Sequence, residues 1–293
     1  MKKLTLLFAF VLLALCAQAA AVDSAASYVY SSDFDQIRAG ASIPIGLSAN
    51  VGLEGKYVYD KNDTGYKDDI YSVYLPIRMD FSFMQLQLVP FYYFKTKAEN
   101  NLFPDAYAYG VTSTLFLKLR EDEVNELYTQ AYIGVSYARQ KAAVWHDADW
   151  EKEIYDQTAF TLGLRQNFFG SFTFQVAGTA YQYPDGVTNV ESFRGIMDQN
   201  DMAFTQSYDI SRELGKYALS ARITRFWPEQ RSSLYIGYHY AEFYTADPQH
   251  SILVGNTFYI AQQARIDMAY NHLQTTSSTN KRDLFYINLS IAF

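Results

Sequence analysis

The chain has 293 residues, with 31 acidic against 24 basic side chains, and aromatic residues make up 17% of it. A net charge of −7 without a basic block argues against a nucleic-acid-binding protein. Beyond the first fifteen residues, no apolar stretch approaches the roughly 18 residues that a membrane-spanning helix needs. A helical membrane protein is therefore excluded.

The N-terminus has the three parts of a secretory signal peptide. Lys2 and Lys3 form the charged part, residues 4–15 the apolar part, and residues 17–19 a small-residue cleavage motif. We expect a signal peptide over residues 1–19 and one mature domain over residues 20–293. The only cysteine, Cys16, lies inside the signal, so the mature chain has no disulfide. A closed hydrogen-bonded sheet is the candidate source of its stability.

Apolar and polar residues alternate along most of the mature chain, which is the period of strands with one apolar face. We count thirteen such segments, and the longer ones reach the 9–11 residues that a tilted strand needs to cross a bilayer. Asn256 and Thr257 blur the alternation in one of them and leave its facing open. The segments lie at residues 37–43, 47–59, 71–81, 86–94, 107–119, 129–137, 160–164, 172–176, 217–223, 234–240, 252–261, 264–270 and 285–293.

Short and long connections alternate between these segments. Short turns on one side and long loops on the other are typical of an outer-membrane barrel. Because the bilayer core offers no water to unpaired backbone groups, such a sheet must close on itself. The short connections are 44–46, 83–84, 120–126, 169–171, 228–232 and 262–263, and the long ones 60–69, 97–105, 140–156, 184–215, 245–250 and 274–283.

A secreted β-sandwich also alternates, but it needs no aromatic girdle. Here aromatic residues such as Tyr57, Tyr71, Tyr137 and Tyr270 fall near the ends of the apolar rows, where they suit the two membrane interfaces. We therefore predict an all-β fold, a transmembrane antiparallel up-and-down β-barrel. Single-chain bacterial barrels have even strand numbers. A strand through residues 28–30 gives fourteen, and the alternative is twelve if residues 20–43 stay outside the wall.

The last segment ends on an aromatic residue preceded by alternating apolar residues: Phe285, Ile287, Leu289, Ile291 and Phe293. This ending resembles the terminal strand of Gram-negative outer-membrane β-barrel proteins of the porin-like class, without matching a specific family. The resemblance implies recognition by the barrel-assembly machinery. It also implies a place in the outer membrane, among its lipid and lipopolysaccharide.

With the apolar rows facing lipid, the opposite rows face the lumen, and basic residues dominate their charges. One interpretation is a passive channel for small solutes that favours anions, since charge in a pore lining sets ion preference. The other is that the arginines are internal struts that seal the barrel, and the sequence leaves both open. The expected lumen residues are Arg38, Lys56, Arg78, Lys118, Arg165, Arg222 and Arg265, against Glu54, Asp80 and Asp267.

The sequence leaves two other functional classes open, a hydrolase and a structural or adhesive barrel. A rim-located lipase or protease is suggested by His146 beside Asp147 and Asp149, and by His250 followed by Ser251. A structural or adhesive barrel without a pore would bind a surface through its acidic outer loops, although solvated loop surface is the simpler interpretation of those acids. Cofactor motifs are absent: the sequence has no glycine-rich phosphate loop, no His-x-x-x-His pair and no cysteine ligand. We expect no cofactor and no metal.

Overall fold

The structure is a computed structural model. It describes residues 23–61, 67–95, 107–122, 127–146, 149–168, 171–184, 186, 192–194, 197–198, 210–211, 214–244, 246–261, 263–276 and 281–291. The expected signal peptide and Phe293 lie outside these residues. No helix long and apolar enough to cross a membrane occurs among them.

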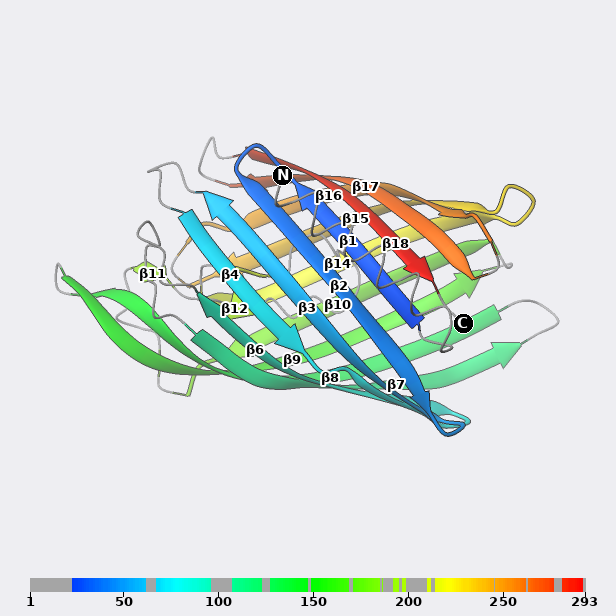
Figure 1. Ribbon diagram of the computed structural model, residues 1–293, viewed down its shortest axis with the longest axis horizontal. Coiled ribbons are helices and arrows are strands. Elements are labelled where there is room, and N and C mark those ends of the chain that lie inside the picture. The colour runs from blue at the N-terminus through cyan, green and yellow to red at the C-terminus, as the bar shows by residue number, and fades with distance from the viewer. Residues whose placement is uncertain are drawn as a thin grey trace.

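The described residues form a closed antiparallel barrel of fourteen wall strands (Figure 1). The wall consists of β1 (Asp23–Tyr30), β2 (Phe34–Ile45), β3 (Ala49–Lys61), β4 (Lys67–Tyr74) continued by β5 (Ile77–Asp80), β6 (Met84–Lys95), β7 (Tyr107–Asp122), β8 (Leu127–His146), β9 (Asp149–Phe168), β10 (Phe172–Gln182), β14 (Gly215–Trp227), β15 (Ser232–Phe243), β16 (Gln249–Tyr259), β17 (Ala264–Thr275) and β18 (Lys281–Ile291). Three short strands lie outside this count: β11 (Ser192–Arg194), β12 (Met197–Asp198) and β13 (Ile210–Ser211).

The N-terminal strand closes the barrel. β1 pairs with β2 on one side and with β18 on the other, from Ser24 opposite Ile291 to Tyr30 opposite Phe285. A tight turn follows, in which the Ser31 amide donates to the Phe34 carbonyl at 2.7 Å. The prediction of fourteen strands is confirmed, and the alternative of twelve is wrong. Without β1, the edges of β2 and β18 would carry unpaired backbone groups, which a bilayer does not tolerate.

The hairpin of β8 and β9 is longer than the alternation predicts. Residues 140–156 were expected to be a loop, but the two strands of 20 residues each continue in register until His146 faces Asp149. In Figure 1 this green hairpin extends past the other strands at the long-loop end. The physical reason is that the backbone hydrogen bonds of an antiparallel ladder do not depend on side-chain polarity, so pairing can continue where the apolar alternation stops.

One proline, Pro76, interrupts a wall strand between β4 and β5. Pro76 has no amide hydrogen, so the ladder is held by the Gly52 amide donating to the Pro76 carbonyl at 2.7 Å. On the other side the Leu75 amide donates to the Pro90 carbonyl at 3.0 Å. A side chain at Gly52 would place its Cβ 2.9 Å from the Pro76 ring, so glycine is needed at this close approach.

The two faces of the barrel differ as the alternation predicts. Large apolar side chains are exposed on the outer face, among them Leu53, Ile133 and Leu162. The facing of β16, left open by the sequence, is clear: Ile252 and Val254 are exposed outside, and Thr257 is buried inside. Because these apolar side chains have no protein cover, the outer face suits lipid rather than a second protein layer.

A repeated hydrogen bond ties the outer face together at the long-loop end. A tyrosine on one strand donates to an aspartate on the next, two residues before the tyrosine's cross-strand partner. The four cases are Tyr28 to Asp35 at 2.6 Å, Tyr57 to Asp69 at 2.6 Å, Tyr137 to Asp156 at 2.9 Å and Tyr270 to Asp283 at 2.6 Å. In β15 and β16 the same diagonal joins the Tyr238 hydroxyl to Nδ1 of His250 at 2.6 Å. These tyrosines place a polar tip above an apolar ring, as a membrane interface requires.

Candidate functional site

The ten charged residues predicted for the lumen lie in seven segments of the wall, β2, β3, β5, β7, β9, β14 and β17. Among them, sequence reasoning alone could not separate a charge that faces solutes from one that is cancelled by a neighbour. The structure divides the seven basic residues into three groups according to what each side chain contacts.

The first group consists of ion-paired residues. Arg38 donates from Nε to Glu54 at 2.5 Å, and Arg78 contacts Asp80 at 3.0 Å. Lys118 lies 3.8 Å from Glu121, near the short-turn rim. Asp80 also accepts a hydrogen bond from the amide of Gln85. A carboxylate beside each of these cations cancels much of its field, so this group fits the strut interpretation.

Lys56 forms the second group. It is buried on the lumen face, and its Nζ lies 5.2 Å from the ring centre of Tyr74 and 5.5 Å from that of Tyr93. The two tyrosine hydroxyls are hydrogen-bonded to each other at 2.6 Å. An ammonium group over aromatic faces is attracted by their quadrupoles. The Lys56 ammonium group therefore packs against the rings of Tyr74 and Tyr93 rather than facing a solute in the lumen.

The third group is Arg165, Arg222 and Arg265. Within the described part of the chain, none of the three forms an ion pair or a hydrogen bond to an acceptor, and Nε of Arg165 and of Arg222 is buried. The Arg222 guanidinium stacks on the Tyr235 ring at 3.7 Å from its centre. The Tyr235 hydroxyl donates to Asp267 at 2.8 Å, and Thr257 donates to the same oxygen at 3.4 Å. These arginines are the basic charges left available to a solute.

One side of the short-turn half of the lumen is hollow. A cavity of about 540 Å³ is lined there by residues of the first three strands and the last three, including Arg38, Glu54, Arg265, Tyr286 and Asn288. Asp23, which the sequence analysis did not single out, also lines it. Its position at the start of β1 was the only available signal, because β1 itself was inferred from strand parity. The cavity lining therefore carries both signs of charge.

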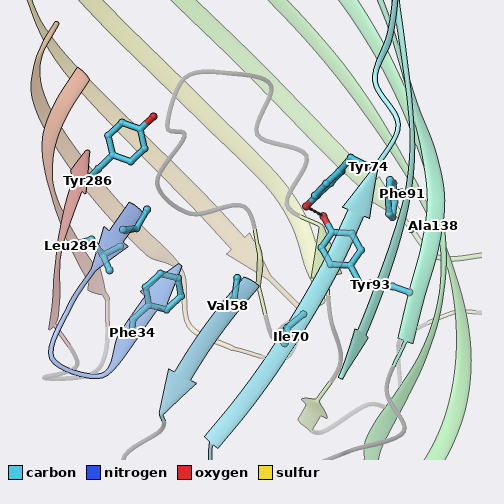
Figure 2. Close-up of a cluster of buried hydrophobic side chains, with 11 residues drawn as sticks. Phe34, Val58, Ile70, Tyr74, Phe91, Tyr93, Ala138, Leu284 and Tyr286 are labelled. Carbon is cyan, nitrogen blue, oxygen red and sulfur yellow. Dashed lines mark hydrogen bonds between the residues drawn. The ribbon is translucent and has the colours of Figure 1, made fainter. Parts of the chain in front are cut away.

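The long-loop half of the lumen is aromatic and packed. Figure 2 shows inward-facing side chains from both ends of the chain gathered there, with Tyr74 and Tyr93 joined through their hydroxyls. Phe91 meets Tyr93 edge to face at 5.3 Å, and Tyr93 is fully buried. A second buried cluster contains Tyr155, Tyr181, Tyr183, Leu214 and Phe243. The alternation did not predict these clusters, because they lie in the rows assigned as polar.

Three inward aromatic rings lie flat over glycines of the neighbouring strand. A Cβ on Gly163 would lie 1.9 Å from Cζ of Tyr132, and one on Gly255 would lie 2.2 Å from Cζ of Tyr235. A Cβ on Gly110 would lie 2.7 Å from Cζ of Phe91 and 1.9 Å from the Tyr137 carbonyl oxygen. Each glycine lets a ring lie along the wall instead of crossing the lumen. The ring of Tyr235 thereby becomes a fixed platform for Arg222.

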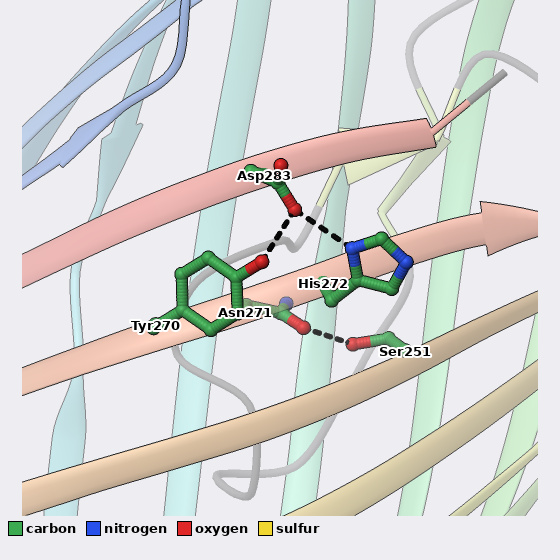
Figure 3. Close-up of polar contacts among 5 residues, drawn as sticks. All are labelled: Ser251, Tyr270, Asn271, His272 and Asp283. Atoms are coloured by element: carbon green, nitrogen blue, oxygen red, sulfur yellow. Dashed lines mark hydrogen bonds and ion pairs between the residues drawn. The ribbon is translucent and has the colours of Figure 1, made fainter.

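Two of the described histidines, His250 and His272, bond to side chains of neighbouring segments of the barrel. Figure 3 shows Asp283 between Tyr270 and His272, whose Nδ1 lies 2.7 Å from the carboxylate, but no hydroxyl of the described residues contacts Nε2 of that imidazole. Ser251 is buried and donates to Oδ1 of Asn271, whereas His250 contacts the hydroxyls of Tyr238 and Thr276. His239 is buried.

The remaining sequence candidates are only partly described. His146 and Asp149 end one strand and begin the next, but their side chains, and Asp147 as a whole, lie outside the described residues. No cluster of His, Cys, Asp and Glu that could hold a metal ion occurs in the ranges given above. Of the expected assembly signal, Phe285, Ile287, Leu289 and Ile291 lie in β18, with Phe285 and Ile287 exposed outward, and Phe293 lies outside the described residues.

A closed fourteen-stranded antiparallel barrel with an apolar outer face is the fold of outer-membrane β-barrel proteins. Two solved structures of outer-membrane channels have a similar fold. The chain is similar to the CymD monoaromatic hydrocarbon channel, with a TM-score of 0.58 at 8% identity over 93% of this chain and 88% of that one. It is also similar to the P. putida toluene transporter TodX, with a TM-score of 0.53 at 11% identity over 93% and 88%. No family model and no curated protein matches the chain.

Proposed function

We propose that the protein is a passive, porin-like channel of the outer membrane for small solutes, and that it favours anions. The observation that carries this proposal is the set of three lumen arginines, Arg165, Arg222 and Arg265, that lack an ion-pair partner among the described residues. Low-dielectric walls focus the field of such charges on a passing ion. Exposed loop charges are screened within about 8 Å at physiological salt, so the wall governs the preference.

Reversal potentials in a salt gradient across a planar bilayer test the proposal. The wild-type protein is expected to pass chloride in preference to potassium. Replacing Arg165, Arg222 and Arg265 by alanine should shift the reversal potential toward cation preference. Arg78→Ala should shift it less, since Asp80 already neutralises that side chain. Cation preference in the wild type, or an unchanged potential after all three replacements, would refute anion preference.

A second candidate is a channel for uncharged aromatic solutes. It is favoured by the aromatic long-loop half of the lumen, where Tyr74, Phe91 and Tyr93 pack together. The two similar structures are described as a monoaromatic hydrocarbon channel and a toluene transporter. Uptake of toluene into vesicles, compared with uptake of benzoate, separates the candidates. Faster benzoate entry that depends on Arg222 supports the anion channel, and toluene entry alone supports the second candidate.

Export and assembly form a separate part of the proposal. A signal peptide over residues 1–19 would direct the chain across the inner membrane, and the barrel-assembly machinery would recognise β18 and Phe293. Replacing Phe293 by aspartate should lower the amount of protein in the outer membrane while leaving folding in detergent intact. N-terminal sequencing of the mature protein should start at Ala20. Unchanged membrane levels of the Phe293 variant would remove the role of the assembly machinery.

A further inference from the structure

One row of side chains crosses five neighbouring strands on the lumen face. The cross-strand register places Lys118 opposite Gln130, Gln130 opposite Arg165, Arg165 opposite Gln175, and Gln175 opposite Arg222. Directly opposed residues share a face of the sheet. The row therefore alternates basic and amide side chains from β7 to β14, and no carboxylate belongs to it.

The row begins at the short-turn rim and leads into the barrel. The Lys118 amide donates to the Phe83 carbonyl in the turn, and the lysine side chain lies near Glu121. Further along the row, Arg165 and Arg222 each have a buried Nε without an acceptor in the described ranges. Arg222 has two charged neighbours, the acidic Asp267 and the basic Arg165. An anion between the two arginines would relieve the repulsion between these like charges.

The orientation of Arg222 suits an anionic group. Its flat face is occupied by the Tyr235 ring at 3.7 Å, and Tyr235 is itself held against Gly255. Stacking leaves the edge of a guanidinium group free, and that edge carries the paired N–H donors that match a carboxylate or a phosphate. Oδ1 of Asp267 accepts hydrogen bonds from Tyr235 and Thr257.

The spacing selects the length of the solute. Neighbouring strands lie about 4.8 Å apart, so the backbones at Arg165 and Arg222, two strands apart, are separated by about 9 to 10 Å along the row. Gln175 lies between them and offers an amide to whatever links the two anionic groups. We infer that Arg165, Gln175 and Arg222 form a lumen subsite for a linear dianion, such as a dicarboxylate, whose charged ends are about two strand spacings apart. The inference rests on the proposed channel and names the solute class that the channel prefers.

Calorimetry on the full mature protein in detergent tests the subsite without requiring conductance. Suberate, an eight-carbon dicarboxylate of about this length, should bind at least about tenfold more tightly than monomethyl suberate, which has the same length and one charge. Arg165→Gln and Arg222→Gln should each lower the suberate affinity about tenfold and leave that of the monoester less affected. Arg225→Gln is the matched control, because Arg225 lies on the same strand but contacts Phe172 and Trp227. Heat-dependent gel migration confirms that each variant folds.

The outcomes separate the subsite from the channel. Equal affinities for suberate and its monoester, or affinities unchanged in both arginine variants, overturn the subsite. If the protein conducts chloride selectively but binds suberate and its monoester with equal affinity, the channel is supported and the subsite is refuted. If suberate binds as expected but no conductance is found, the subsite is supported and the proposed channel is refuted.

Discussion

The two halves of the lumen use their inward-facing residues differently. At the long-loop end, Phe91, Tyr93 and Tyr74 pack against one another and are almost free of solvent contact. At the short-turn end, Arg38, Glu54 and Asn288 surround a cavity of about 540 Å³. The alternating strands thus build a packed core at the long-loop end and leave a cavity, the vestibule, beside the first and last strands at the short-turn end. A row of side chains that faces away from lipid therefore need not face water.

Truncating an aromatic ring gives the largest expected difference between the halves. Phe91→Ala should lower the free energy of unfolding by about 3–5 kcal/mol, because it leaves a cavity in the packed half. Tyr259→Ala, beside the vestibule, should cost about 1 kcal/mol, mainly its edge-to-face contact with Phe226. Urea titrations of barrels folded into lipid vesicles measure both. Equal losses would mean that the two halves are packed alike.

An added charge compares the vestibule with the lipid face. Ile133→Arg on the outer face should cost about 2–4 kcal/mol if this position lies at mid-bilayer. Ser42→Arg, which faces the cavity, should stay within about 0.5 kcal/mol. Thr112→Arg should cost more than the Ser42 change, because Thr112 is buried against Ser136 at 3.1 Å in the packed half. The same titrations apply, and a costly Ser42 variant would contradict a hollow vestibule.

The glycines beneath the aromatic rings test how the packed wall is kept flat. Gly163→Ala should destabilise the barrel by about 1–3 kcal/mol, since its Cβ would overlap the Tyr132 ring. Gly55→Ala, where a Cβ would meet no atom within 4 Å, is the control and should have little effect. Adding Tyr132→Leu to the Gly163 variant should recover part of the loss. No recovery would show that the ring is not what opposes the new side chain.

The smallest expected effect concerns the outer face of the long-loop half. Tyr270→Phe removes the hydroxyl that donates to Asp283 and should cost about 1 kcal/mol. Tyr92→Phe is a suitable control, because the hydroxyl of this outward tyrosine has no hydrogen bond in the described ranges. If both variants lose the same stability, the diagonal bonds of the interface contribute nothing beyond the rings themselves.

The strands, most of their inner and outer faces and a count of fourteen or twelve strands could be predicted from the amino-acid sequence alone. These follow from a period of two residues, which is local, and from the requirement that a sheet in lipid leave no edge. β1 was predicted from parity alone, through Tyr28 to Tyr30, and the structure places it there. The length of the β8–β9 hairpin was missed, because alternation ends where lipid ends although pairing continues.

Which lumen charges are available to a solute depends on the tertiary structure. Arg38 meets Glu54 across sixteen residues of chain, and Arg282 meets Asp33 across 249, so no local pattern could reveal these pairs. The same applies to the availability of Arg165 and Arg222, which depends on what the register brings beside them. Local sequence sets which way a side chain points, whereas its partner is set by register and closure. Electrostatic interactions depend on that distance in space and not on separation along the chain.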